Sequence, residues 1–101
     1  MKDNHINYKE KLDALFAWFE ENKYEPEYND KGKEINREFN LVCQFADWVE
    51  DGNNFDTIID ITELNADFKD SDDFKCAAGK LCDIAIKGVE TWLKEGKWWN
   101  K

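Results

Sequence analysis

The sequence lacks most of the features by which catalytic, metal-binding and membrane-spanning proteins are recognised. It has one histidine, one proline and three cysteines, no Cys-x-x-Cys pair and no glycine-rich phosphate loop. No apolar run approaches the about 20 residues that a transmembrane helix needs. No apolar stretch follows the basic residue near the N-terminus, so no signal peptide is visible. We therefore expect a protein of the reducing cytoplasm that does not enter a membrane.

Reactive side chains are too few and too scattered to indicate an enzyme. Cys43, Cys76 and Cys82 are odd in number and widely spaced, which fits neither a disulfide framework nor a zinc site. His5, the only histidine, lies close to the N-terminus, where a chain is usually poorly ordered, so it is a poor candidate for a catalytic base. We predict no catalytic residue, no metal and no cofactor, and hence a binding protein.

Enough apolar material is present for one folded domain. The chain has 101 residues, of which 42% are hydrophobic and 15% aromatic. A domain of this size buries about 60–65% of its unfolded surface. We predict a single small acidic domain over residues 1–101, with a short tryptophan-rich tail at residues 96–101.

Four segments show helical periodicity, approximately residues 4–22, 34–50, 56–68 and 71–95. The first carries Tyr8, Leu12, Leu15, Phe16 and Phe19 on one face, and the second carries Ile35, Phe39, Val42, Ala46 and Val49. Lys23–Lys33, with Pro26 and Gly32, has the composition of a loop. Gly52 is placed for a left-handed C-terminal cap. These segments predict an all-α fold, a compact antiparallel bundle of about four helices.

The third segment is ambiguous between helix and strand. Within Phe55–Phe68, residues 57–62 are rich in β-branched side chains, which favour a strand. A single short strand would have no partner elsewhere in the chain, and an isolated strand is unstable. We therefore interpret this segment as a helix and keep the strand as the alternative.

The net charge of −9 is confined to residues 47–73. This stretch holds ten carboxylates and one basic residue, Lys69, whereas the other 74 residues carry thirteen of each sign. Such a local excess of negative charge opposes binding to nucleic acid or an anionic membrane and favours a basic partner. The carboxylates are Asp47, Glu50, Asp51, Asp56, Asp60, Glu63, Asp67, Asp70, Asp72 and Asp73.

Helical geometry predicts that half of these carboxylates form one stripe. On a continuous helix they fall within about 80° and extend for about 21 Å. The predicted stripe is Asp56, Asp60, Glu63, Asp67 and Asp70, with Asp47, Glu50 and Asp51 at its edge. Asp72 and Asp73 follow the helix-capping Ser71, where carboxylates favourably oppose the helix dipole, and need no functional explanation.

The stripe suggests a nucleic-acid mimic. We expect a non-enzymatic protein that inhibits or neutralises a nuclease or other nucleic-acid-binding protein by presenting carboxylates to its basic groove. Phage anti-defence proteins, including anti-CRISPR inhibitors, and immunity proteins against nuclease toxins work in this way. This is an expectation from charge and size.

Three alternatives remain open. The acidity can serve solubility alone, on a solvated face without a partner. In a helical adaptor or assembly subunit, contacts would then come from aromatic residues, with Trp98 and Trp99 as a secondary partner-binding or homodimer surface and Tyr24 or Tyr28 contributing. In a calcium-binding regulator, the ligands would come from Asp51–Glu63. Counting back from Glu63 as the twelfth position, however, places Gly52 at position 1, where calcium loops have aspartate.

Overall fold

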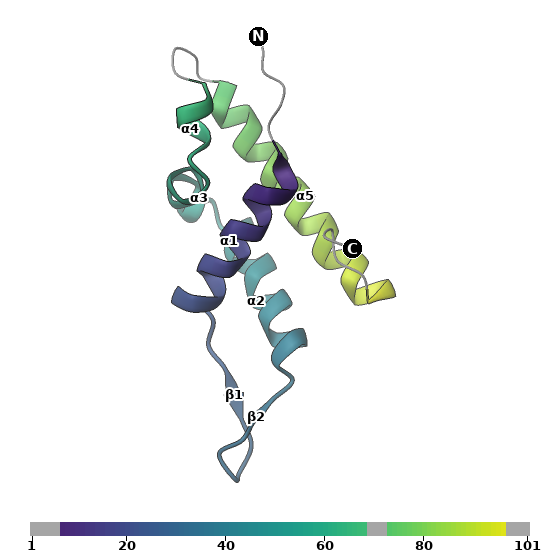
Figure 1. Cartoon of the computed structure of the whole chain (residues 1–101). Coiled ribbons are helices and arrows are strands. Elements are labelled where there is room, and N and C mark those ends of the chain that lie inside the picture. The colour runs from purple at the N-terminus through teal and green to yellow at the C-terminus, as the bar shows by residue number, and fades with distance from the viewer. Residues whose placement is uncertain (1–6, 69–72, 97–101) are drawn as a thin grey trace.

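The computed structural model describes residues 7–68 and 73–96, and most of these residues are helical (Figure 1). The all-α prediction is confirmed, with one addition, a short hairpin between the first two long helices. The elements in chain order are α1 (Tyr8–Asn22), β1 (Glu27–Tyr28), β2 (Glu34–Ile35), α2 (Arg37–Glu50), the 3-10 turn η1 (Gly52–Asn54), α3 (Phe55–Thr62), α4 (Leu64–Asp67) and α5 (Asp73–Glu95).

The core forms where the apolar faces of these helices meet. On α1, Leu12, Leu15 and Phe19 are buried, as the periodicity predicts. The Asn7 side chain caps this helix by accepting a hydrogen bond of 3.0 Å from the Glu10 backbone N–H. Residues of α2, α3, α4 and α5 complete the core: Leu41, Val42, Phe45, Val49, Ile58, Ile59, Leu64, Ala77, Ala78, Leu81, Ala85 and Val89.

α5 packs most extensively against α2 and also contacts α1, α3 and α4. Its buried face is rich in small residues, including Ala77, Ala78 and Gly88, which lets the neighbouring helices approach closely. The helix ends at Gly96 (φ 70°), whose N–H donates to the Trp92 carbonyl at 2.8 Å. The left-handed conformation costs glycine little, so its place at the helix end has a direct physical reason.

A two-stranded hairpin projects from the helices (Figure 1). It begins within Lys23–Lys33, the stretch expected to be a loop, and its second strand, Glu34–Ile35, was expected to be helical. Its strands pair antiparallel, Glu27 opposite Ile35 and Tyr28 opposite Glu34. The Tyr24 hydroxyl donates to Glu34 at 2.7 Å, and the Arg37 guanidinium lies 5.0 Å from the centre of the Tyr24 ring. These side-chain contacts between residues distant in sequence stabilise strands too short to be recognised from composition.

Three expectations for α2 and its C-terminal end are wrong. The helix begins at Arg37 instead of residue 34, and Phe39 is 54% exposed because Leu41, Val42, Phe45 and Val49 form the buried face. Gly52 is not a left-handed cap. Instead, Asp51 ends α2 in an extended conformation, and its side chain accepts a 3.0 Å hydrogen bond from the Asn53 N–H to start η1.

The helix interpretation of the third segment is confirmed over Phe55–Thr62, and the strand alternative is wrong. The segment is not one continuous helix, however. Glu63 adopts the left-handed conformation (φ 56°) and separates α3 from α4. The Thr62 carbonyl, at the end of α3, accepts a 2.6 Å hydrogen bond from the Lys11 ammonium group on α1.

The break between α3 and α4 follows from the position of Leu64. In an uninterrupted helix this side chain would project about 170° away from the buried face of Ile58, Ile59 and Thr62. The left-handed residue redirects the chain, and Leu64 becomes fully buried. A left-handed residue with a side chain costs about 1–2 kcal/mol. Full burial of a leucine contributes about 1.5–3 kcal/mol, which is large enough to offset the backbone strain.

Candidate functional site

Six of the ten carboxylates in residues 47–73 have described side chains outside the start of α5, and all six are exposed: Asp47, Glu50, Asp51, Asp56, Asp60 and Glu63. Counted over residues 7–68 and 73–96, none of the six lies within 4.0 Å of a lysine or arginine nitrogen. Their negative charge is therefore not neutralised by direct contact with the described part of the protein.

Less is described of the other four carboxylates of the acidic stretch, Asp67, Asp70, Asp72 and Asp73. Asp67 ends α4, and nothing further is described of its side chain. Asp70 and Asp72 lie outside the described residues, as does the predicted capping residue Ser71. Asp73 is the first residue of α5, where a carboxylate was expected on dipole grounds.

The break at Glu63 replaces the predicted single stripe with two groups of carboxylates. Asp56 and Asp60 lie one turn apart on α3, as expected for a four-residue spacing. Asp47, Glu50 and Asp51 gather at the end of α2, and η1 joins the two groups. A continuous helical face over residues 56–70 does not form, because Glu63 turns the chain before Asp67. The partner-binding role of these residues remains a prediction.

Three carboxylates outside the acidic stretch are held by side-chain contacts: Glu20, Glu27 and Glu34. The only arginine, Arg37, forms ion pairs with both Glu20 and Glu34. Glu27 accepts a 2.9 Å hydrogen bond from the Asn40 amide. These contacts connect the hairpin to α1 and α2, so the carboxylates there are structural. No comparable contact accounts for Asp56 or Asp60 within the described chain.

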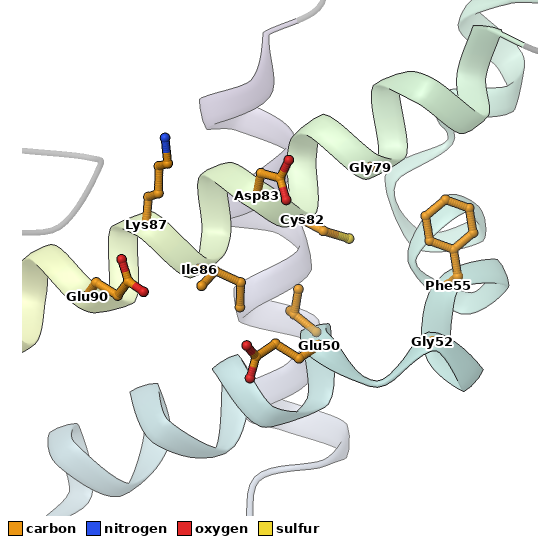
Figure 2. A pocket seen from close by; sticks show the side chains of 10 residues that line it. Glu50, Gly52, Phe55, Gly79, Cys82, Asp83, Ile86, Lys87 and Glu90 are labelled. Carbon is orange, nitrogen blue, oxygen red and sulfur yellow. The ribbon is translucent and has the colours of Figure 1, made fainter.

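A groove opens beside this acidic surface, between the end of α2, η1, the start of α3 and one face of α5 (Figure 2). It has a volume of about 620 Å³. Phe55, Cys82 and Ile86 are half-buried against the core and give it an apolar floor. Its other lining residues are Val49, Glu50, Gly52, Gly79, Asp83, Lys87 and Glu90.

Three carboxylates and one ammonium group line the groove. Glu50 extends from the end of α2, and Asp83 and Glu90 lie on α5. Figure 2 shows the Lys87 side chain on α5 pointing away from α2. The lining therefore has a net charge of −2, and the groove continues the negative surface formed by the carboxylates of α2 and α3.

Sequence reasoning placed Glu50 at the edge of the acidic stripe but missed the groove. The six α5 residues that line it are spaced as one helical face: Gly79, Cys82, Asp83, Ile86, Lys87 and Glu90. This mixture of apolar, charged and small residues has no clear amphipathic signal. Only the packing of α2 and η1 beside α5 reveals it as a groove.

The thiols near this surface are poorly suited to nucleophilic chemistry. Burial raises the pKa of Cys82, and the charge of Asp83 raises it further. Burial likewise raises the pKa of Cys43, with a contribution from Asp47. A thiol with a raised pKa is protonated at neutral pH, and the thiolate is the reactive form. Cys82 therefore contributes to the groove as a small apolar side chain.

Two other kinds of site are absent from the described residues. Over 7–68 and 73–96, no group of three or more histidine, cysteine, aspartate or glutamate side chains is arranged to hold a metal ion. No described helix combines the length and apolar character that crossing a membrane requires. Trp98 and Trp99, the predicted secondary contact surface, lie outside the described residues.

What this surface recognises has to be inferred from its chemistry. The chain matches no protein-family model, no curated protein and no solved structure.

Proposed function

We propose that this protein is a non-enzymatic inhibitor that occupies the basic groove of a nucleic-acid-handling protein, of the kind found among phage anti-defence proteins, anti-CRISPR inhibitors and nuclease-immunity proteins. The observation that carries the proposal is the group of six exposed carboxylates without ion pairs on α2, on α3, at Asp51 between α2 and η1, and at Glu63. The basic groove of a nucleic-acid-binding protein attracts the negative charges of phosphates, and it would attract these carboxylates in the same way.

The arrangement of Asp56 and Asp60 supports a binding role over a purely structural one. Two carboxylates four residues apart on a helix repel each other by about 0.2–0.5 kcal/mol. Asp60 also lies in the last turn of α3, where negative charge opposes the helix dipole. A face kept only for solubility would include lysines, as the exposed face of α5 does. A cationic partner would remove both penalties by neutralising the charge.

Affinity capture with charge variants tests the proposal. The wild-type protein is used to capture partners from the lysate of its native host, in parallel with Asp56→Lys plus Asp60→Lys. The control is Glu21→Lys plus Glu95→Lys, which makes the same change in net charge at exposed positions outside residues 47–73. We expect a nuclease or other nucleic-acid-binding protein to be retained by the wild type and the control, lost with the α3 variant and displaced by duplex DNA.

Salt and competition make the result decisive. Binding through exposed charges weakens as salt screens them. Retention that is unchanged at high salt, or unaffected by duplex DNA and by the two α3 substitutions, would rule out nucleic-acid mimicry.

The adaptor function is the second candidate, and exposed aromatic side chains favour it. Tyr28 is 59% exposed on the hairpin, and Phe39 is 54% exposed at the start of α2. Exposed aromatic residues are common anchors in interfaces. If Tyr28→Ala plus Phe39→Ala abolishes partner capture while the α3 charge variant retains it, the adaptor function replaces the inhibitor.

A further inference from the structure

The groove beside α5 contains a glycine that the fold itself does not require. Gly79 lies in the interior of α5, where glycine is destabilising relative to alanine. A Cβ added there would meet no atom within 4 Å, and the residue does not have a positive φ. Gly52, on the opposite wall, is equally unconstrained. The absence of side chains at these two positions keeps the groove open and serves no packing need within the described chain.

The dimensions and lining of the groove fit one kind of occupant. The α5 residues from Gly79 to Glu90 span about 16 Å, or about three helical turns. Along this length, Phe55, Cys82 and Ile86 offer apolar contact, and the negative charges of Glu50, Asp83 and Glu90 exceed the one positive charge of Lys87. A helix with an apolar stripe flanked by basic residues is complementary to this pattern.

We propose that the groove binds a basic amphipathic helix of the partner protein. Apolar side chains of that helix pack on Phe55 and Ile86, and its lysine or arginine side chains pair with Glu50, Asp83 and Glu90. Gly79 allows the backbone of the helix to approach α5 closely. This inference rests on the proposed function, since it assumes a basic partner, and it adds a defined docking site to the charged surface.

Synthetic peptides test the groove without knowledge of the partner. The probe is a fluorescent peptide of leucine and lysine, about 14 residues long, with the leucines on one helical face. Controls are a scrambled peptide of the same composition and an oligolysine of the same charge. Fluorescence anisotropy on the full-length protein measures the affinities, and amide NMR spectra locate the binding. We expect the amphipathic peptide to bind more tightly than the scrambled one and to shift the signals of Gly79 and Ile86.

Substitution of Gly79 separates folding from binding. We expect Gly79→Ala and Gly79→Leu to raise the thermal midpoint, because each replaces a glycine in a helix interior by a better helix former. An added Cβ would meet no atom within 4 Å at this position. Gly79→Leu should weaken binding of the amphipathic peptide by about tenfold or more, by filling the groove, and leave oligolysine binding unchanged. Ala17→Leu, which adds three of the same four carbon atoms on an exposed face of α1, should change the binding of neither peptide. Glu90→Lys provides a second groove variant that does not alter packing.

The outcomes distinguish failure of the groove from failure of the proposed function. If Gly79→Leu and Glu90→Lys both leave peptide binding unchanged, the groove is not the docking site. The charged surface is then tested separately by the loss of oligolysine binding in Asp56→Lys plus Asp60→Lys. If neither the amphipathic peptide nor oligolysine binds at low salt, both proposals fail.

Two other occupants would overturn the inference. A wild-type dimer that becomes monomeric with Gly79→Leu, measured by sedimentation, would assign the groove to a second copy of the chain. A gain in peptide affinity in the full-length variant Trp98→Ala plus Trp99→Ala would assign it to the protein's own C-terminal segment.

Discussion

Leu64→Ala is the substitution that most directly tests the break between α3 and α4. Leu64 is fully buried although it lies between the exposed residues Glu63 and Asn65. Its burial depends on the left-handed conformation of Glu63, because a continuous helix would direct the side chain away from Ile58 and Ile59. The cost of truncating it therefore reports whether the chain turns at this point.

The expected magnitude follows from the loss of a fully buried leucine. Leu→Ala substitutions in a core cost about 2.7–5 kcal/mol, depending on how far the cavity closes. At the boundary between two helices the surroundings can relax, so we expect Leu64→Ala to lower the free energy of unfolding by about 3 kcal/mol. A domain of this size has a total stability of about 5–15 kcal/mol, so the variant should remain folded but be clearly weakened. Leu93→Ala is the matched control, because Leu93 is 48% exposed, and it should cost less than about 1 kcal/mol.

Urea denaturation, followed by tryptophan fluorescence and circular dichroism, measures both values. The midpoint for Leu64→Ala should fall while the slope of unfolding free energy against urea stays unchanged. Leu64→Met, which conserves volume, should cost less than about 1.5 kcal/mol and keeps the test usable if the alanine variant is too unstable. If Leu64→Ala costs no more than Leu93→Ala, Leu64 is not in the core and the helix is continuous. The acidic stripe would then be restored as one face.

Four further predictions concern the same region and the two thiols of α5. Glu63→Gly should raise the unfolding free energy by about 0.5–1 kcal/mol, because glycine adopts the left-handed conformation without strain. Glu63→Val should lower it. Urea midpoints that move in the opposite directions would contradict the left-handed conformation of Glu63. Asp60→Asn should stabilise the free protein by about 0.3–1 kcal/mol at low salt, by relieving its repulsion with Asp56, while weakening partner capture. Cys76, which is exposed, should react with a thiol reagent faster than Cys82, as mass spectrometry of the labelled protein would show. Burial raises the folded-state pKa of Cys82 above its unfolded value near 9.0. The stability that the protonated thiol provides should therefore be complete below that pH and be lost as the pH rises through the folded-state pKa. Unfolding curves of wild type and Cys82→Ala should differ in this alkaline range.

Local patterns in the sequence predicted the helices well and their connections poorly. The spacing of Leu12, Leu15 and Phe19 identified the buried face of α1, because a buried helix repeats its apolar residues at the helical period whatever it packs against. The same spacing misassigned Phe39, since several faces of α2 carry apolar residues and only its neighbours decide which is buried. The hairpin was missed because its strands are two residues long and are supported by side chains such as Tyr24 and Arg37.

The sequence by itself determined the helical class, the composition of the core faces and the confinement of the negative charge to residues 47–73, because periodicity and charge are properties of neighbouring residues. The tertiary structure decided how that charge is displayed. Burial of Leu64 and the bond from Lys11 to the Thr62 carbonyl turn the chain at Glu63, so the predicted stripe becomes two groups of carboxylates. The packing of α2 and η1 beside α5 then forms the groove. These features depend on contacts between residues far apart in the chain, which no local pattern specifies.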